Sequence, residues 1–138
     1  MKHTSWTPAE APYTLHDMNV IAFETDGCDL VLRTQSGMIK TSPPYPQPNG
    51  YVTFRNVDFD LSFVYFFDNT GNVGPFTGRK LFLKDFIHAA QNFGFSVLDE
   101  TYGFHQTVYS GHLSMHQAFS ACAIEIYHEG DIVFSSEE

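Results

Sequence analysis

Basic residues are scarce in this chain of 138 residues. Seven lysines and arginines stand against sixteen aspartates and glutamates, which gives a formal net charge of −9. Phosphate backbones and anionic lipid surfaces attract basic proteins, so we expect neither nucleic acid nor a membrane among the partners. An acidic surface is compatible with a basic protein partner, with cation binding or simply with solubility. As partners we expect a basic protein or a second copy of the chain through self-association.

Cysteine is scarce too, since only Cys28 and Cys122 are present and no CxxC or Cys/His metal-site spacing occurs. The first ten residues lack the apolar core of a signal peptide, and no run approaches the roughly eighteen apolar residues of a membrane span. We therefore expect a cytoplasmic protein with two free thiols, both buried among strand residues.

The chain also lacks the motifs by which enzymes and nucleotide-binding proteins are commonly recognised. It contains no GxGxxG or P-loop sequence, no HExxH and no GxSxG. We expect no cofactor, and the missing motifs favour a non-enzymatic protein.

Aromatic residues, by contrast, are abundant. They make up 16% of the chain, with fourteen phenylalanines within a hydrophobic content of 43%. Large aromatic side chains fill a core quickly and fit strands better than helices. A chain of this length buries about two thirds of its unfolded surface on folding. We predict a single domain over residues 1–138, with a loose N-terminal arm over 1–12.

Short apolar runs separated by turn signals indicate many strands. Asp26-Gly27 is the strongest hairpin signal and joins predicted strands over 18–25 and 28–34. Further strands are predicted over 95–99 and 102–109, around a corner at Asp99-Glu100, with a turn at Ser110-Gly111. The pattern predicts an all-β fold, an antiparallel β-sandwich or flattened barrel.

One short α-helix is predicted over residues 83–93. Leu83, Phe86, Ile87 and Ala90 form an apolar stripe at helical spacing, and Gly94 follows as a natural stop. We expect the helix to cover one sheet or cap an open end of the sandwich.

Residues 51–67 form the longest stretch with a strand pattern. Its first half places Val52 and Phe54 at even positions, whereas from Val57 onward the apolar residues fall at odd positions. Strand side chains alternate with a period of two, so this change of phase requires a bulge or a bend. We predict the break at Arg55-Asn56.

Asp58 and Asp60 are candidate binding residues on the polar face of this stretch. Two residues apart on a strand, their Cα atoms would lie roughly 6.5 Å from each other. Their carboxylates could then act as an acid/base pair or contribute to a cation site. A solvated strand face is the simpler interpretation of the two residues.

Tyr45 is a third candidate, because it stands in the proline-rich loop SPPYPQPNG over residues 42–50. Such a loop is stiff and presents its side chains to partners, although a rigid crossover between sheets is the simpler interpretation.

Two histidines have a metal-like spacing, although exposed histidines without a metal are the simpler interpretation. His112 and His116 would be neighbours on a helix and could share a metal, whereas on a strand about 13 Å would separate them. Residues 112–119 fit either structure. His16 and Asp17 resemble a base with its carboxylate, but on an extended chain adjacent side chains point to opposite faces and do not pair.

Three functions remain open. The leading hypothesis is a non-enzymatic binding or protein-interaction module. The second is binding of a carbohydrate or small molecule on an aromatic-lined sheet face, since tyrosine and tryptophan stack on sugar rings. The third is a small metal- or carboxylate-dependent enzyme that uses Asp58, Asp60 or the histidines.

Overall fold

A computed structural model describes residue 1, residues 10–68, residue 75 and residues 77–137. These residues form a mostly antiparallel β structure with two sheets and one short α-helix, a flattened sandwich rather than a closed barrel. The elements are β1 (Tyr13–Thr14), β2 (Asn19–Asp26), β3 (Asp29–Thr34), β4 (Ile39–Lys40), β5 (Gly50–Phe54), the 3-10 turn η2 (Phe59–Leu61), β6 (Phe63–Phe67), β7 (Gly78–Phe82), α1 (Leu83–Ala89), β8 (Phe93–Gly103), β9 (Gln106–Met115), β10 (Ala118–Tyr127) and β11 (Ile132–Ser136).

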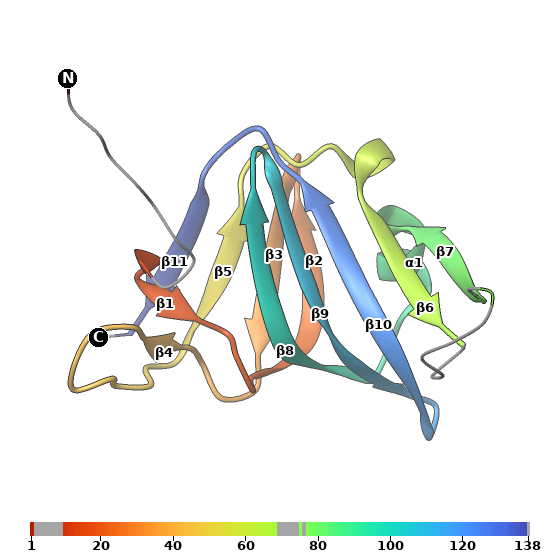
Figure 1. Cartoon of the computed structure of the whole chain (residues 1–138), viewed down its shortest axis with the longest axis horizontal. Helices are drawn as coiled ribbons and strands as arrows, with labels where there is room; N and C mark the ends of the chain where they lie inside the picture. Colours follow the sequence, from red (N-terminus) through yellow and green to blue (C-terminus); the bar gives the residue numbers. More distant parts are fainter. Residues whose placement is uncertain (2–9, 69–74, 76, 138) are drawn as a thin grey trace.

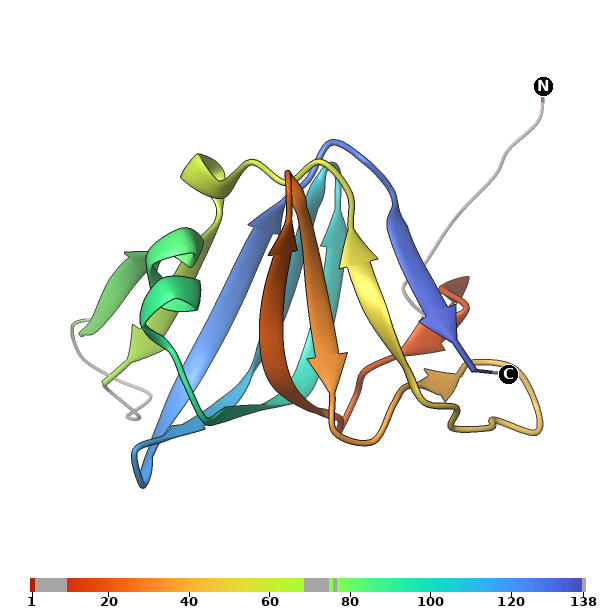
Figure 2. The same cartoon turned by 180° about the vertical axis from the view of Figure 1, so that it is seen from behind.

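The larger sheet has nine strands in the order β11-β5-β3-β2-β8-β9-β10-β6-β7, and β1 pairs with β4 in a separate small sheet. The large sheet folds over on itself at the seam between β2 and β8, where only two residue pairs connect the strands. One layer therefore carries β8, β9, β10, β6 and β7, and the other carries β2, β3, β5 and β11 (Figures 1 and 2). The small sheet lies beside the end of the molecule where both chain termini are found (Figure 1).

The core fills the space between these two layers. Leu32 and Phe54 from one layer and Phe95 and Ile124 from the other are fully buried, and they belong to a single hydrophobic cluster. Alternate residues of each strand face this cluster, as the pleat requires. The predicted all-β sandwich is confirmed.

The break predicted at Arg55-Asn56 is larger than a bulge. β5 ends at Phe54, Asn56 adopts a left-handed conformation (φ 53°), and β6 begins only at Phe63. β5 pairs with β3 and β11, whereas β6 pairs with β10 and β7, so the two halves lie in different layers. Residues 51–67 are two strands joined by a crossover.

The helix begins where predicted but ends early. α1 covers Leu83–Ala89, and Ala90 is already extended. Phe93, predicted as the last helical residue, starts β8 and pairs with Met115. The strand pairing and the stack of Phe93 on Phe23, with ring centroids 5.5 Å apart, prevail over the local helical pattern.

The predicted corner at Asp99-Glu100 and turn at Ser110-Gly111 are wrong. β8 runs through both acidic residues, with a bulge between Val97 and Asp99, and β9 runs through Gly111 opposite that bulge. The bulge moves Glu100 onto the inward face, which the alternation of the sequence does not reveal.

The predicted loose arm falls largely on residues 2–9, which lie outside the described residues. No described helix is long and apolar enough to cross a membrane.

Candidate functional site

The prediction that Asp58 and Asp60 share a strand face is wrong, because both lie at the 3-10 turn η2. They flank the first residue of η2, where the Asp58 Oδ1 atom accepts a hydrogen bond from the Asp60 backbone N–H at 3.0 Å. Asp58 therefore serves as an N-cap, as aspartate commonly does. Asp60 points to a different partner, since its Oδ1 atom lies 2.6 Å from the Lys84 Nζ atom at the start of α1.

The histidine pair has strand geometry. His112 lies within β9, and His116 lies in the β9–β10 hairpin with a left-handed backbone (φ 53°). The helical alternative for residues 112–119 is thus wrong. Across the described part of the chain, no three His, Cys, Asp or Glu side chains gather as metal ligands.

Near the ion pair of Asp60, three aromatic side chains and a lysine lie together on the outer face of β6 and β7. We call this group the aromatic strip and define it as Phe63, Tyr65, Lys80 and Phe82. Phe63 pairs with Phe82 and Tyr65 with Lys80 across the two strands, so all four side chains share one face. That face is the outer one, because the alternate residues of β6, such as Phe66, are buried against α1.

Within the aromatic strip, the Lys80 ammonium lies close to two of the aromatic rings. The Lys80 Nζ atom lies 3.9 Å from the centroid of the Phe63 ring and 5.6 Å from that of Tyr65. The ring centroids of Phe63 and Phe82 lie 5.3 Å apart, and Phe82 is 41% exposed. At this range an ammonium is attracted to the electron-rich faces of the rings. Lys80 is thereby held over the strip while its charge stays at the surface.

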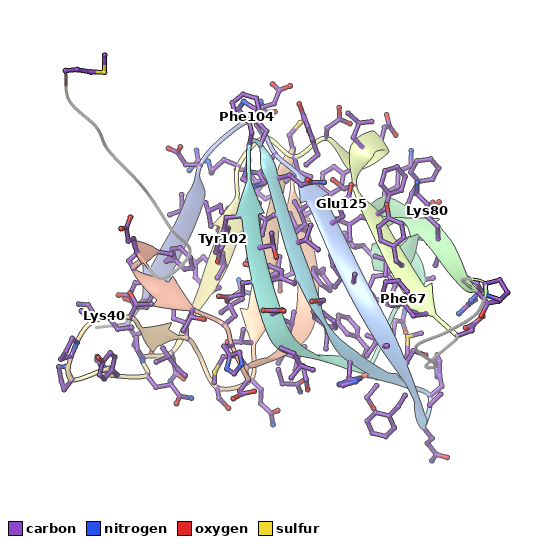
Figure 3. All side chains as sticks on the ribbon, in the orientation of Figure 1. Lys40, Phe67, Lys80, Tyr102, Phe104 and Glu125 are labelled. Atoms are coloured by element: carbon purple, nitrogen blue, oxygen red, sulfur yellow. The ribbon has the colours of Figure 1, made fainter. Side chains whose placement is uncertain are left out.

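Charged groups close both ends of the strip. At one end the Lys84 Nζ atom, already paired with Asp60, lies 5.2 Å from the Phe82 ring. At the other end the Tyr65 hydroxyl donates a hydrogen bond of 3.2 Å to Glu125 on β10. Burial and the Glu125 carboxylate raise the pKa of Tyr65, so the phenol stays protonated as a donor. Lys80 and Glu125 lie on the two sides of β6 (Figure 3).

The strip borders an open strand edge. β7 is the last strand of the sheet, and no other described strand pairs with its outer edge. Leu83 N donates to Ser62 O, and Asp68 N donates to Thr77 O, which sets the positions of the hydrogen-bonded pairs between β6 and β7. Because such pairs alternate along an antiparallel ladder, the backbone N–H and C=O groups of Gly78 and Lys80 point away from β6 toward the free edge.

Two cations on this edge have no acidic partner among the residues that the structure describes. Arg79 and Lys80 contact rings, with the Arg79 guanidinium 4.9 Å from the Phe66 centroid, but neither forms an ion pair within the described ranges. Arg33 and Arg55 elsewhere on the molecule contact carboxylates at 2.8 and 3.5 Å. In a protein of net charge −9, this edge is a local basic surface.

The remaining sequence candidate, Tyr45, lies at a different place. Its side chain is 58% exposed and lines an open pocket of about 430 Å³ between the small sheet and β8. His16 lines the same pocket, and its Nδ1 atom lies 3.1 Å from the Asp17 carboxylate. The expectation that these neighbours do not pair was wrong, because Asp17 has a left-handed backbone (φ 65°) instead of an extended one.

Glu100 completes the polar lining of this pocket. The Thr14 hydroxyl donates to its Oε2 atom at 2.7 Å, and the Leu15 backbone N–H donates to its Oε1 atom. Burial raises the pKa of Glu100, although both hydrogen bonds and the nearby His16 oppose that shift. Sequence reasoning missed this residue because the predicted corner placed it at the surface.

Sequence reasoning also missed the β7 edge, although a signal was present. The segment GRKLFLK contains Arg79, Lys80 and Lys84, three of the seven lysines and arginines of the chain.

Cys28 was expected to be buried but is exposed in the β2–β3 turn, whereas Cys122 is buried as expected.

Comparison of the chain with protein families, with curated proteins and with solved structures finds no match. Function must therefore be inferred from the surfaces and pockets themselves.

Proposed function

We propose that this chain is a protein-interaction module that binds an acidic, extended segment of a partner protein along β7. The observation that carries the proposal is the free β7 edge, on which Arg79 and Lys80 have no carboxylate partner among the described residues. Addition of a strand to an open sheet edge is a common mode of peptide recognition.

The backbone and the side chains of β7 would contribute differently. The outward N–H and C=O groups of Gly78 and Lys80 supply main-chain hydrogen bonds, which any extended segment can make. Selectivity comes from the side chains, since Lys80 stands on the outer face and Arg79 on the inner face. Successive residues of a bound strand also alternate faces, so two adjacent acidic residues would meet one cation each. An apolar residue next on the outer face would contact Phe82.

The same charges disfavour pairing of β7 with a second β7. Two such edges would bring Arg79 and Lys80 of both copies together, and like charges on paired strands are destabilising. Basic residues on an exposed edge are a known protection against unspecific strand pairing. An acidic segment escapes this barrier, so protection against self-pairing and selection of a partner have a common physical cause. The partner favoured by this edge is acidic, in contrast to the basic partner expected from the net charge alone.

Carbohydrate binding on the same rings is a weaker alternative. The aromatic strip meets its main requirement in part, because Phe82 is exposed and Phe63 and Tyr65 are half-buried on the same sheet face. The Lys80 ammonium, however, lies 3.9 Å from the Phe63 centroid and covers the face on which a sugar ring would stack. Displacing this cation would cost part of the stacking energy.

The proposal is tested with labelled peptides that have the alternating pattern of a strand and carry either two adjacent glutamates or two glutamines. Fluorescence anisotropy should show binding of the acidic peptide, weakened by added salt because the charges are exposed. The double variant R79Q/K80Q should bind about tenfold more weakly, a loss of about 1.4 kcal/mol.

The matched control is R33Q/R55Q, which also removes two positive charges, but from strand and turn positions away from β7. This control should keep the affinity of the original chain. Equal loss in both double variants would reduce the effect to net charge, and equal binding of the acidic and neutral peptides would contradict the proposal. A glycan panel bound in place of the peptides would favour the carbohydrate alternative.

A further inference from the structure

The pocket between the small sheet and β8 is separate from the aromatic strip, because β9 and β10 lie between β8 and β6 in the large sheet. The pocket contains groups of both charges. Lys40 and His16 belong to the segments around β4 and β1, whereas Asp99 and Glu100 belong to β8. Its volume of about 430 Å³ lies within the usual range for small-molecule sites.

The pocket exists because β8 loses its neighbour. Pairing of β2 with β8 ends at Asn19 and Ser96, and Val97 makes the last backbone hydrogen bonds to the 15–18 segment. Beyond Val97 the edge of β8 opens toward the small sheet. The bulge between Val97 and Asp99 turns Glu100 inward. Its half-buried carboxylate therefore lines the pocket in the part of β8 that does not pair with β2.

Glu100 also ties the two sheets together, because it accepts hydrogen bonds from Thr14 and Leu15 at the end of β1. Each carboxylate oxygen can accept more than one hydrogen bond, so these contacts leave acceptor capacity for a ligand. Asp99 adds a second, exposed carboxylate on the same wall. This wall suits a cationic group that donates several hydrogen bonds, such as an ammonium.

The other walls differ in chemistry. Lys40 and His16 bring a cation and an imidazole, while Ile39, Leu98 and the exposed ring of Tyr45 bring apolar surface. A ligand of a single charge would face a like charge on one wall, which is unfavourable. A ligand with both charges close together avoids that conflict.

We propose that this pocket binds a small zwitterion of the α-amino acid type. Its ammonium group would lie toward Asp99 and Glu100, its carboxylate toward Lys40 and His16, and an apolar side chain against Tyr45 and Leu98. The site is independent of the peptide-binding edge, and either proposal can fail without the other.

Three related molecules separate the two charges experimentally. Leucine carries both, leucinamide lacks the carboxylate, and N-acetylleucine lacks the ammonium. Titration of the full chain, followed by chemical-shift changes of backbone amides, should show leucine binding at least tenfold more tightly than either blocked form. The shifts should be confined to residues around β1, β4 and the second half of β8.

Variants identify the groups responsible. E100Q keeps an oxygen that can accept one of the two hydrogen bonds and should weaken leucine binding about tenfold. Y45A and D99N alter exposed side chains, spare the fold and should each weaken binding severalfold. D26N, at an exposed acidic residue in the β2–β3 hairpin, is the control and should leave binding unchanged.

Equal affinity for leucine and leucinamide, equal affinity for leucine and N-acetylleucine, or the absence of confined shifts with all three would overturn the proposal. Unchanged leucine binding in both Y45A and D99N would do the same, whatever the behaviour of E100Q.

Discussion

At the scale of single residues, Glu100 combines a structural and a chemical role. It joins β1 to β8 through two hydrogen bonds, yet burial raises its pKa above the ordinary carboxyl value of 4.5. A raised pKa means that the folded protein holds this proton more tightly than the unfolded chain. The stability that Glu100 contributes is therefore fully present below about pH 4.5 and is lost as the pH rises through the raised pKa.

The substitution Glu100→Gln should remove this dependence, because glutamine stays neutral and still accepts a hydrogen bond. Urea unfolding of both proteins between pH 4 and pH 7 measures the effect. E100Q should gain stability relative to the original chain as the pH rises, whereas D26N should follow the original profile. Parallel profiles for E100Q and the original chain would contradict the assigned direction of the pKa shift.

At the scale of elements, the sequence predicted those features that local chemistry determines. The Asp26-Gly27 hairpin was predicted because Gly27 supplies the left-handed backbone (φ 63°) that its turn requires. The start of α1 and the break after Phe54 followed from changes of apolar period. The early end of α1 and the continuity of β8 could not be predicted, because pairing with Met115 and a bulge opposite Gly111 determine them. The candidate residues on β7 and β8 were missed for the same reason. The free edge of β7 and the inward position of Glu100 depend on how the strands pair, which the local sequence does not show.

The contact between β8 and β9 at the bulge gives a prediction at this scale. A Cβ atom built on Gly111 would lie 1.8 Å from the Ser96 carbonyl oxygen, a backbone atom that cannot move aside. Gly111→Ala should therefore destabilise the fold by about 2–3 kcal/mol in urea unfolding. Gly103→Ala, at the end of β8, meets its nearest atom at 3.8 Å and should be close to neutral. Similar stability of the two variants would show that the strands do not approach so closely at Gly111.

At the scale of the whole molecule, the order of strands interleaves the two halves of the chain. β5 pairs with β11, and β6 pairs with β10, so segments from the middle of the chain lie beside segments from its end. Among the described strands, a cut in the sequence divides the nine-stranded sheet into two contiguous parts only between β10 and β11, where it removes the single edge strand β11. The buried residues of both layers also form one hydrophobic cluster. These features favour a single domain that unfolds cooperatively.

The Cys122 thiol offers a probe for that cooperativity. It is buried in β10, and burial raises its pKa to about 12, so the reactive thiolate is absent from the folded protein at pH 8. In a C28S variant, which lacks the exposed thiol, labelling of Cys122 should require the loss of the core. The labelled fraction should follow the same urea transition as circular dichroism, because β10 can open only with the layers around it. Labelling of Cys122 at urea concentrations that leave the circular dichroism unchanged would show that β10, β6 and β7 open separately from β2, β3 and β5, and that the chain is not one cooperative domain.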